Sequence, residues 1–346
     1  MAVAALVICA ALAVLARLSG LDVGRAVAAL WRGSFGSADA LLSSTLVRAS
    51  TLILAGLAVA IAFRAGILNI GAEGQLLVGA AAAAAVGGAI AASFGRATLI
   101  AELAGGAAAG AAWAWIAAML RRRFGVLEVI STLMLNFLAL YVVSYLVRGP
   151  LQEPLRIYPQ TASLPDVARL PALFSGMRLH WGFPIAVVCA VAAWAFLRYT
   201  AGGFRLRAVG MNPAAAWSAG LIDVPGVTTR AFLVSGALAG LAGAIEVTGV
   251  SFALYENLSP GYGYSAIAVA LLARLNPALV IVTGILLGAL EAGGSAMQRD
   301  ASVPSALVSV LEALLLIGVI VLERTARRRV AATGGDVEEA LGVAAP

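Results

Sequence analysis

Residues 52–86 read LILAGLAVAIAFRAGILNIGAEGQLLVGAAAAAAV, and this stretch contains the pattern that decides the fold. Two apolar runs, at about 47–63 and 76–93, flank a break that carries an asparagine, a glutamate, a glutamine and several glycines. A hydrocarbon core about 30 Å thick needs roughly 20 apolar residues per helix, so each run predicts one membrane-spanning helix. Lipid offers no hydrogen bonds to irregular backbone, so the break must face protein or water.

The composition of the whole chain gives the same prediction. Of its 346 residues, 62% are hydrophobic and 12% are charged, and the mean hydropathy is +0.98. These values predict an all-α integral membrane protein, one transmembrane domain over 1–346, with about 8–10 spanning helices, some of them broken or re-entrant. The expected spans lie at about 1–16, 47–63, 76–93, 98–119, 126–147, 183–198, 231–250, 265–275, 277–291 and 303–322.

Two of these spans are too short to cross a bilayer. The runs at 265–275 and 277–291 are separated only by RLNP, which ends in Pro277. Because proline cannot continue a helix interior, we expect two half-helices or a re-entrant hairpin. The first span lacks the basic residues that begin a signal peptide, so it is expected to be a retained helix.

The charged residues exclude several functions. All 23 basic residues are arginine, and the net charge of +6 is spread over loop ends, which does not suit nucleic-acid binding. A chain without lysine cannot contain the Walker A motif, so it is not expected to hydrolyse ATP itself. Cys9, Cys189 and His180 show neither disulfide nor metal-ligand spacing. The sequence therefore predicts no catalytic group, no metal site and no bound cofactor.

Arginine clusters predict the orientation in the membrane, because arginine is retained on the cytoplasmic side. The clusters at 121–123, 198–230 and 324–329 fall on one side if the spans alternate. Both termini, including the tail 323–346, are then cytoplasmic, and the loop 148–182 lies outside. Arginines within that loop and within the segment 17–46 run against the rule.

Small residues four positions apart allow helices to pack closely in lipid. The chain contains three such pairs, which predict tight helix packing and leave dimerisation as an alternative; they are Gly106 with Gly110, Gly236 with Gly240, and Gly284 with Gly288.

The candidate substrate path lies at two polar breaks. The first, residues 64–75, contains Asn69, Glu73 and Gln75, and the second, near the RLNP sequence, contains Arg274 and Asn276. Paired discontinuous helices near the membrane midplane build the substrate sites of many transporters. We therefore expect these side chains to line or brace the path. The alternative is an ordinary cytoplasmic turn in which Glu73 is solvated.

Ionisable residues inside spans usually have a partner or belong to a pathway. Glu246 follows a run of small residues and is expected in a structural ion pair, with Arg274 as one possible partner, or in the cavity. Glu102 and Glu128 are expected at the membrane interface. The spans do not carry the string of Asp, Glu and His that a proton relay needs, which argues against a proton-coupled carrier.

Residues 210–221, GMNPAAAWSAGL, predict a short capped helix between two spans. Asn212 suits the N-cap, Pro213 the first helical position and Gly220 the C′ position, with Ala216 between them. Helices this short are marginal in water unless something holds them. We expect this helix to dock onto a partner, or alternatively to lie on the bundle itself.

Five stretches together resemble the permease subunits of bacterial ABC importers, within the sugar and nucleoside branch and nearest to the purine-nucleoside type. The likeness covers residues 45–325 in order. The stretches are GILNIGAEGQLLVG, STLMLNFLALYVVSYLVRGPLQEP, RAVGMNPAAAWSAGL, VSGALAGLAGAIEV and IAVALLARLNPALVIVTGILLGALEAGG.

The resemblance implies a transport subunit of the bacterial inner membrane that imports nucleosides and is not an enzyme. It implies a cytoplasmic ATPase subunit that uses ATP and Mg²⁺, a second permease subunit, and an extracytoplasmic substrate-binding lipoprotein, all around a chain embedded in lipid. By analogy, 210–221 is the coupling helix, and Asn136 joins the candidate path. Arg274 departs from the small residue expected there. A pentose as cargo, or a secondary carrier without an ATPase, remain the alternatives.

Overall fold

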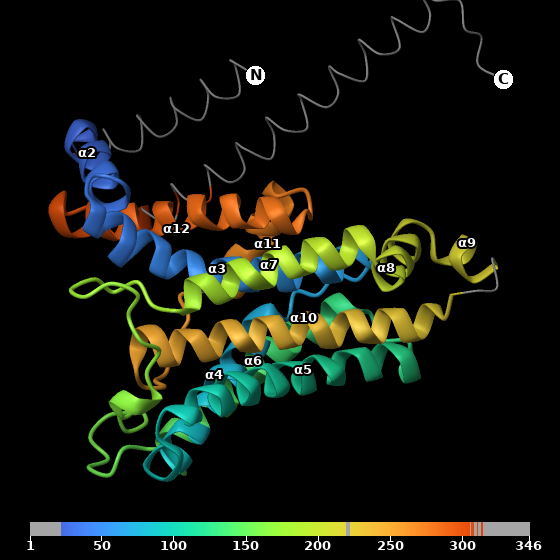
Figure 1. Cartoon of the computed structure of the whole chain (residues 1–346), viewed down its shortest axis with the longest axis horizontal. Helices are drawn as coiled ribbons and strands as arrows, with labels where there is room; N and C mark the ends of the chain where they lie inside the picture. Colours follow the sequence, from blue (N-terminus) through green and yellow to red (C-terminus); the bar gives the residue numbers. More distant parts are fainter. Residues whose placement is uncertain (1–21, 219–221, 305, 308–309, 311–312, 314–346) are drawn as a thin grey trace, which may run out of the picture. The chain divides into compact units, whose positions relative to one another are not determined.

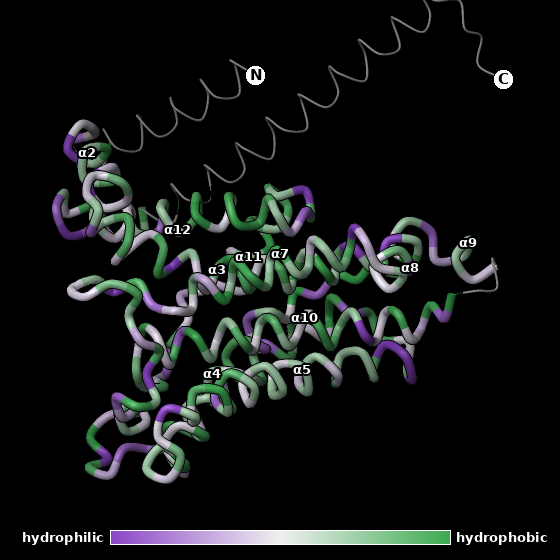
Figure 2. The backbone as a smooth tube through the Cα atoms, in the orientation of Figure 1, coloured by the Kyte–Doolittle hydropathy of each residue, from purple (hydrophilic) through white to green (hydrophobic). Residues whose placement is uncertain are grey.

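The computed structural model describes residues 22–218, 222–304, 306–307, 310 and 313, and their regular structure is helical. Figure 2 shows hydrophobic residues along the helices and hydrophilic residues gathered at helix ends and in connecting segments. The predicted all-α membrane fold is confirmed. In these residues six stretches are long and apolar enough to cross a membrane: Ala40–Arg64, Ala72–Phe124, Glu128–Arg148, Gly182–Tyr199, Val224–Ser251 and Pro277–Asp300.

The helices follow one another with short connections, except for a long segment between α6 and α7. In chain order they are α2 (Val23–Ser34), η1 (Ala40–Thr45), α3 (Leu46–Arg64), α4 (Ala72–Phe94), η2 (Gly95–Ala97), α5 (Thr98–Phe124), α6 (Glu128–Arg148), η3 (Asp166–Ala168), α7 (Gly182–Tyr199), α8 (Ala201–Met211), α9 (Pro213–Ser218), α10 (Val224–Glu246), η4 (Val247–Ser251), α11 (Tyr262–Leu272) and α12 (Pro277–Asp300). The short helices η1 and η4 are π-helical and continue into α3 and from α10, respectively.

The longest apolar stretch, Ala72–Phe124, consists of two membrane passes. Its 53 residues would extend about 80 Å as one helix, far more than a bilayer core. The 3₁₀ turn η2 divides it, and Gly95 adopts a φ of 52° there, which glycine tolerates without strain. The described residues therefore contain seven full-length passes, close to the predicted positions.

The prediction for the last part of the described chain is half right. α11 has 11 residues, about 16 Å of helix, and is the expected half-helix. α12 has 24 residues and is long enough to cross the membrane, so the prediction of a second half-helix at 277–291 is wrong. The helix continues through the small and polar residues EAGGSAMQRD, whose low hydropathy hid its length.

The chain divides into two compact units, residues 38–291 and the segments on either side of them. Within the flanking unit, Asp22 caps α2 by accepting hydrogen bonds from the Gly24 and Arg25 amides. Ala26 and Ala29 of α2 form a small apolar core with Met297 of α12.

The larger unit is centred on α10, which packs against α3, α4 and α5. Glycines bring these backbones together: a Cβ at Gly240 would lie 2.2 Å from Gly106 O, and one at Gly110 would lie 2.3 Å from Gly236 O. On α12, a Cβ at Gly288 would lie 2.8 Å from Thr45 O. The predicted close packing through small residues is confirmed.

The two ends of this unit differ in their connections (Figure 1). α8 and α9 lie at one end, beside the C-terminal ends of α5 and α7 and the start of α10. The segment 149–181 lies at the opposite end. The predicted span 1–16, most of 303–322, the tail 323–346, Cys9 and Gly220 lie outside the described residues.

Candidate functional site: a buried polar junction and the cavity on α6

The polar break after α3 turns back into the helix bundle. Residues 65–71 leave the end of α3 through Gly66, whose φ of 74° lies in the left-handed region. Ile67 and Asn69 are fully buried. The Asn69 amide reaches α10, where its Nδ2 donates to Ser235 Oγ at 2.8 Å. The irregular backbone therefore lies within protein, as a membrane protein requires.

Asn69 and Gln75 form a reciprocal pair of amide hydrogen bonds. Asn69 Nδ2 donates to Gln75 Oε1, and Gln75 Nε2 donates to Asn69 Oδ1, both at 3.1 Å. Asn69 Oδ1 also accepts from the Gly71 amide at 2.9 Å. Ser235 in turn donates its hydroxyl to Ala58 O of α3 at 2.7 Å. This network joins the break to α3, α4 and α10.

Asn136 of α6 holds the first turn of α4. No side chain of the preceding Gly71 can cap this helix, and its first amides need partners from elsewhere. Asn136 Oδ1 accepts from the Gly74 amide at 2.8 Å, and its Nδ2 donates to Ile70 O at 2.9 Å and to Tyr264 Oη at 3.3 Å. Asn136 therefore acts as a cap supplied from another helix.

Glu73 is a buried carboxylate between two helix N-termini. It lies in the first turn of α4, and its Oε2 accepts a 2.6 Å hydrogen bond from the Gly263 amide in the first turn of α11. Helix N-termini favour negative charge, so both dipoles stabilise it. Its exposed fraction is 4%, so the alternative of a turn with a solvated Glu73 is wrong. We call Asn69, Glu73, Gln75 and Asn136 the polar junction.

Glu246 and Arg274 are not brought together. Glu246, at the end of α10, accepts from Thr51 Oγ1 at 2.7 Å, whereas the turn carrying Arg274 contacts the far end of α3, where Arg64 Nε donates to Leu275 O at 2.9 Å. Thr51 and Arg64 are 13 positions apart on α3, about 20 Å along its axis. Arg274 is therefore not the partner of Glu246, whose carboxylate instead accepts from Thr51 and is attracted by the charges of Arg48 and Arg178.

The second break forms the turn between α11 and α12 and caps the start of α12. Asn276 Oδ1 accepts from the Ala278 amide at 3.1 Å and so caps α12, while Arg274 and Leu275 adopt positive φ values of 51° and 57°. Asn276 is therefore a helix-capping residue. It lies beside the end of α3 that is far from Glu246, and its side chain is not part of the polar junction.

Glu102, expected at the membrane interface, lies in the second turn of α5, near the start of that helix. It is fully buried, and a Cβ on Gly87 would lie 1.9 Å from its Oε1. No hydrogen-bond partner for its carboxylate is present among the described residues. The glycine opposite makes room for the carboxyl group, which hydropathy along the chain does not reveal.

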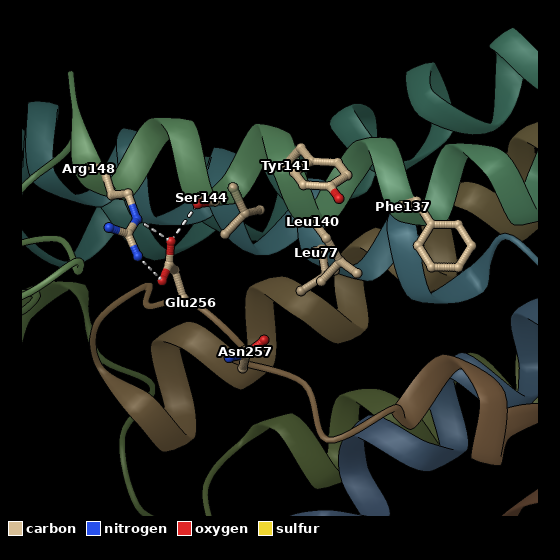
Figure 3. A pocket seen from close by; sticks show the side chains of 9 residues that line it. Leu77, Phe137, Leu140, Tyr141, Ser144, Arg148, Glu256 and Asn257 are labelled. Carbon is tan, nitrogen blue, oxygen red and sulfur yellow. Dashed lines mark hydrogen bonds and ion pairs between the residues drawn. The ribbon is translucent and has the colours of Figure 1, made fainter.

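A cavity of about 390 Å³ lies farther along α6, where this helix, Leu77 of α4 and residues 256–257 line it. Figure 3 shows Phe137, Tyr141, Ser144 and Arg148 following one another along α6. Their spacing of three and four residues places them on one helix face. We call it the α6 cavity, and its walls are Leu77, Phe137, Leu140, Tyr141, Val143, Ser144, Arg148, Glu256 and Asn257.

An ion pair closes one end of the α6 cavity (Figure 3). Arg148 donates from Nε and Nη2 to the two carboxylate oxygens of Glu256 at 2.6 and 2.8 Å, and Ser144 donates to the same carboxylate. The hydrogen bonds from Arg148, followed by that from Ser144, lower the pKa of Glu256 from 4.5 to about 2. The carboxylate is therefore ionised at every physiological pH.

The cavity suits a small ligand with a flat ring and hydroxyl groups. Its volume falls within the range of roughly 300–1,000 Å³ for small-molecule sites. Phe137 and Tyr141 are 49% and 74% exposed and can offer ring faces. Asn257 can both donate and accept, and its side chain has no partner among the described residues.

The sequence marked the residues of the polar junction as candidates and missed the α6 cavity. The aromatic residues at 137 and 141 lie within a long apolar run and looked like any lipid-facing pair. Arg148 and Glu256 are 108 positions apart, so no local pattern joins them. The one available signal was the four-residue spacing of the two aromatic residues on a predicted helix.

The predicted capped helix is α9. Asn212 Oδ1 accepts from the Ala215 amide at 3.0 Å, Pro213 begins the helix, and Ala216 is buried. Met211 and Trp217 are 88% and 72% exposed at this end of the bundle. The cap is confirmed, and exposed apolar side chains flank it.

A bundle of membrane-crossing helices interrupted by a buried polar junction defines a multi-pass membrane protein. Residues 41–320 match the family model described as the permease component of the branched-chain amino acid transport system. The chain belongs to this family of ABC transporter permeases and is a transport subunit.

Several relatives align along most of the chain. A glucose ABC transporter permease of Haloferax volcanii is 38% identical over 85% of this chain and 83% of its own length. A guanosine ABC transporter permease of Bacillus subtilis is 38% identical over 89% of this chain and 88% of its own. A nucleoside ABC transporter permease of Lactococcus lactis is 28% identical over 84% and 82%, respectively.

Proposed function

We propose that this chain is the membrane-spanning subunit of an ATP-driven importer that carries nucleosides, and purine nucleosides in particular, into the cell. The observation that carries the cargo assignment is the α6 cavity, in which two aromatic rings lie near polar groups. A nucleobase stacks on such rings, and ribose hydroxyls hydrogen-bond to an amide such as Asn257. The relatives named for guanosine and nucleosides support the same cargo.

A simple sugar is the second candidate cargo, because a relative of equal identity is named a glucose permease. A sugar offers hydroxyl groups to Asn257 and Glu256 and can pack a C–H face on an aromatic ring, but it has no π face to stack. The aromatic pair therefore favours the nucleoside through stacking alone, and the relatives named for nucleosides add to this preference.

The proposed complex contains a cytoplasmic ATPase subunit, a second permease subunit and an extracytoplasmic substrate-binding lipoprotein. The ATPase subunit would bind ATP and Mg²⁺, and this chain would bind no cofactor. We place the ATPase at α9, because Met211 at the end of α8 and Trp217 of α9 are exposed and offer apolar side chains to a partner. A six-residue helix with one buried residue gains its stability from contacts beyond itself.

The proposed orientation in the bacterial inner membrane places α8 and α9 in the cytoplasm, together with both termini. Arg121–Arg123 at the end of α5 and the arginines of α8 support this side. The segment 149–181 would then face outward. In a chain without Cys9 and Cys189, a membrane-impermeant thiol reagent should label Ser163→Cys from outside. Labelling only after the membrane is opened would reverse the orientation.

Uptake of labelled guanosine by cells that express the whole complex tests the cargo. Unlabelled adenosine and guanosine should compete, whereas glucose and ribose should not. Competition by glucose without competition by guanosine would assign the sugar instead.

Variants of the α6 cavity test the site separately. Base stacking on an aromatic ring contributes about 1–3 kcal/mol, so Phe137→Ala or Tyr141→Ala should raise KM roughly 5- to 150-fold. Tyr145→Ala is the matched control, since Tyr145 is equally exposed on α6 and does not line the cavity. An unchanged KM in both cavity variants would show that the substrate does not bind in the α6 cavity. The assignment of the cargo by competition would not be affected.

A further inference from the structure

A second, larger cavity lies on the opposite part of the bundle, between α7, α8 and α10. It measures about 600 Å³, and its walls are mainly apolar. We call it the α7–α10 groove; its apolar lining includes Cys189, Ala193, Phe196, Val227, Val234 and Leu238.

The groove is elongated along the helices. On α10 its lining runs from Val227 to Leu238, about 16 Å along the axis, and on α7 from Cys189 to Phe196, about 10 Å. Both helices are apolar enough to cross the membrane, so this apolar channel runs parallel to the acyl chains of the bilayer.

Two arginines stand at one end of the groove. Arg205 on α8 and Arg230 on α10 both line it, and both side chains are exposed. Neither has an acidic partner or a hydrogen bond among the described residues. They lie where α7 ends and α10 begins, because α8 folds back against Phe196. The site thus combines an apolar channel with two free guanidinium groups at its mouth.

We propose that the α7–α10 groove binds one anionic phospholipid, with an acyl chain in the channel and the phosphate between Arg205 and Arg230. Guanidinium groups bind phosphate oxygens through charge-assisted, often bidentate hydrogen bonds. Basic pockets between transmembrane helices are suited to anionic headgroups. A protein partner without negative charge would leave both guanidinium groups unmatched, which is why charge complementarity selects the lipid.

Native mass spectrometry of the purified transporter in detergent tests this proposal. The protein is titrated with phosphatidylglycerol and, separately, with phosphatidylcholine of the same chain length. Wild type should retain phosphatidylglycerol in preference to phosphatidylcholine. Arg205→Ala/Arg230→Ala should bind phosphatidylglycerol roughly thirtyfold more weakly and phosphatidylcholine as before.

Arg122→Ala/Arg123→Ala is the matched control, because these arginines are exposed at the end of α5, outside the groove. It should retain phosphatidylglycerol like wild type. Equal loss in the control, unchanged binding in Arg205→Ala/Arg230→Ala, or equal retention of both lipids by wild type would overturn the proposal.

The reactivity of Cys189 provides a second measurement, made on the folded protein. Its thiol lines the groove, so added phosphatidylglycerol should slow its reaction with a maleimide in a Cys9→Ser background. The same lipid should not slow the reaction in Arg205→Ala/Arg230→Ala. Equal protection in both proteins would show that the lipid does not sit between these arginines.

Discussion

Replacement of Asn69 by alanine should destabilise the protein through the partners that it leaves behind. Asn69 is fully buried and takes part in four side-chain hydrogen bonds. Ser235 keeps its bond to Ala58 O after the substitution. Three buried groups lose a partner, namely the Gly71 N–H and the Oε1 and Nε2 atoms of Gln75.

The size of the effect follows from these three groups. A buried polar group without a partner costs about 1–3 kcal/mol in soluble proteins. Hydrogen bonds between membrane helices contribute less, about 0.6 kcal/mol on average, because the unfolded chain in lipid also finds partners. The bounds are therefore about 2 and about 9 kcal/mol, and we expect about 3 kcal/mol for Asn69→Ala.

Equilibrium unfolding in mixed micelles, with increasing SDS, measures this free energy. Gln298→Ala is the control, because Gln298 is exposed on α12, and it should lie within about 0.5 kcal/mol of wild type. The double variant Asn69→Ala/Gln75→Ala should cost less than the sum of the single variants, by about 1–2 kcal/mol. The reason is that removal of Gln75 also removes two of the three unpaired groups.

Two results would refute this reasoning. The first is an Asn69→Ala variant as stable as Gln298→Ala, which would mean that water or a shifted backbone satisfies the freed groups. The second is strict additivity of Asn69→Ala and Gln75→Ala, which would mean that the reciprocal amide pair does not form.

Three further predictions concern other parts of the chain. Gly240→Ala should lower the unfolding temperature sharply, because its Cβ would lie 2.2 Å from a carbonyl oxygen of α5, whereas Gly88→Ala, with nothing within 4 Å, should be silent. The hydrogen bonds from Arg148 lower the pKa of Glu256 to about 2, so the stabilisation from its ionised carboxylate is complete above pH 4.5 and is lost only as the pH falls toward 2. The uptake of Glu256→Gln relative to wild type should therefore be constant from about pH 5.5 to 8. Trp217→Ala should reduce substrate-stimulated ATP hydrolysis in the assembled complex while its unfolding temperature stays unchanged, because the side chain is 72% exposed.

The membrane helices were predictable because lipid imposes a simple rule. Each backbone polar group must be bonded within its own segment, so apolar runs of sufficient length become helices. The run at 98–119 became α5 and the run at 183–198 became α7, with ends shifted by a few residues. The rule fails where a helix continues through small polar residues, as α12 does beyond Glu291.

The contacts of the polar junction could not be predicted from the sequence. The residue types at 69, 73 and 75 marked the break as polar, but their partners lie far along the chain. Asn136 is 62 positions from Gly74, and Gly263 is 190 positions from Glu73. Such pairings depend on how helices pack, and a single sequence carries no record of that.

Neighbouring residues of α6 serve a bracing role and a ligand-binding role. Asn136 faces the polar junction and holds α4, whereas the next residue, Phe137, lines the α6 cavity. Leu77, one turn beyond Gly74, lines the same cavity from α4. A cavity needs walls that are fixed by their supporting contacts, and here the junction supplies them. Asn69→Ala should therefore reduce the amount of assembled transporter with little change in KM, and Phe137→Ala should raise KM with assembly intact. The reverse pattern, a raised KM for Asn69→Ala and poor assembly for Phe137→Ala, would place the substrate in the junction.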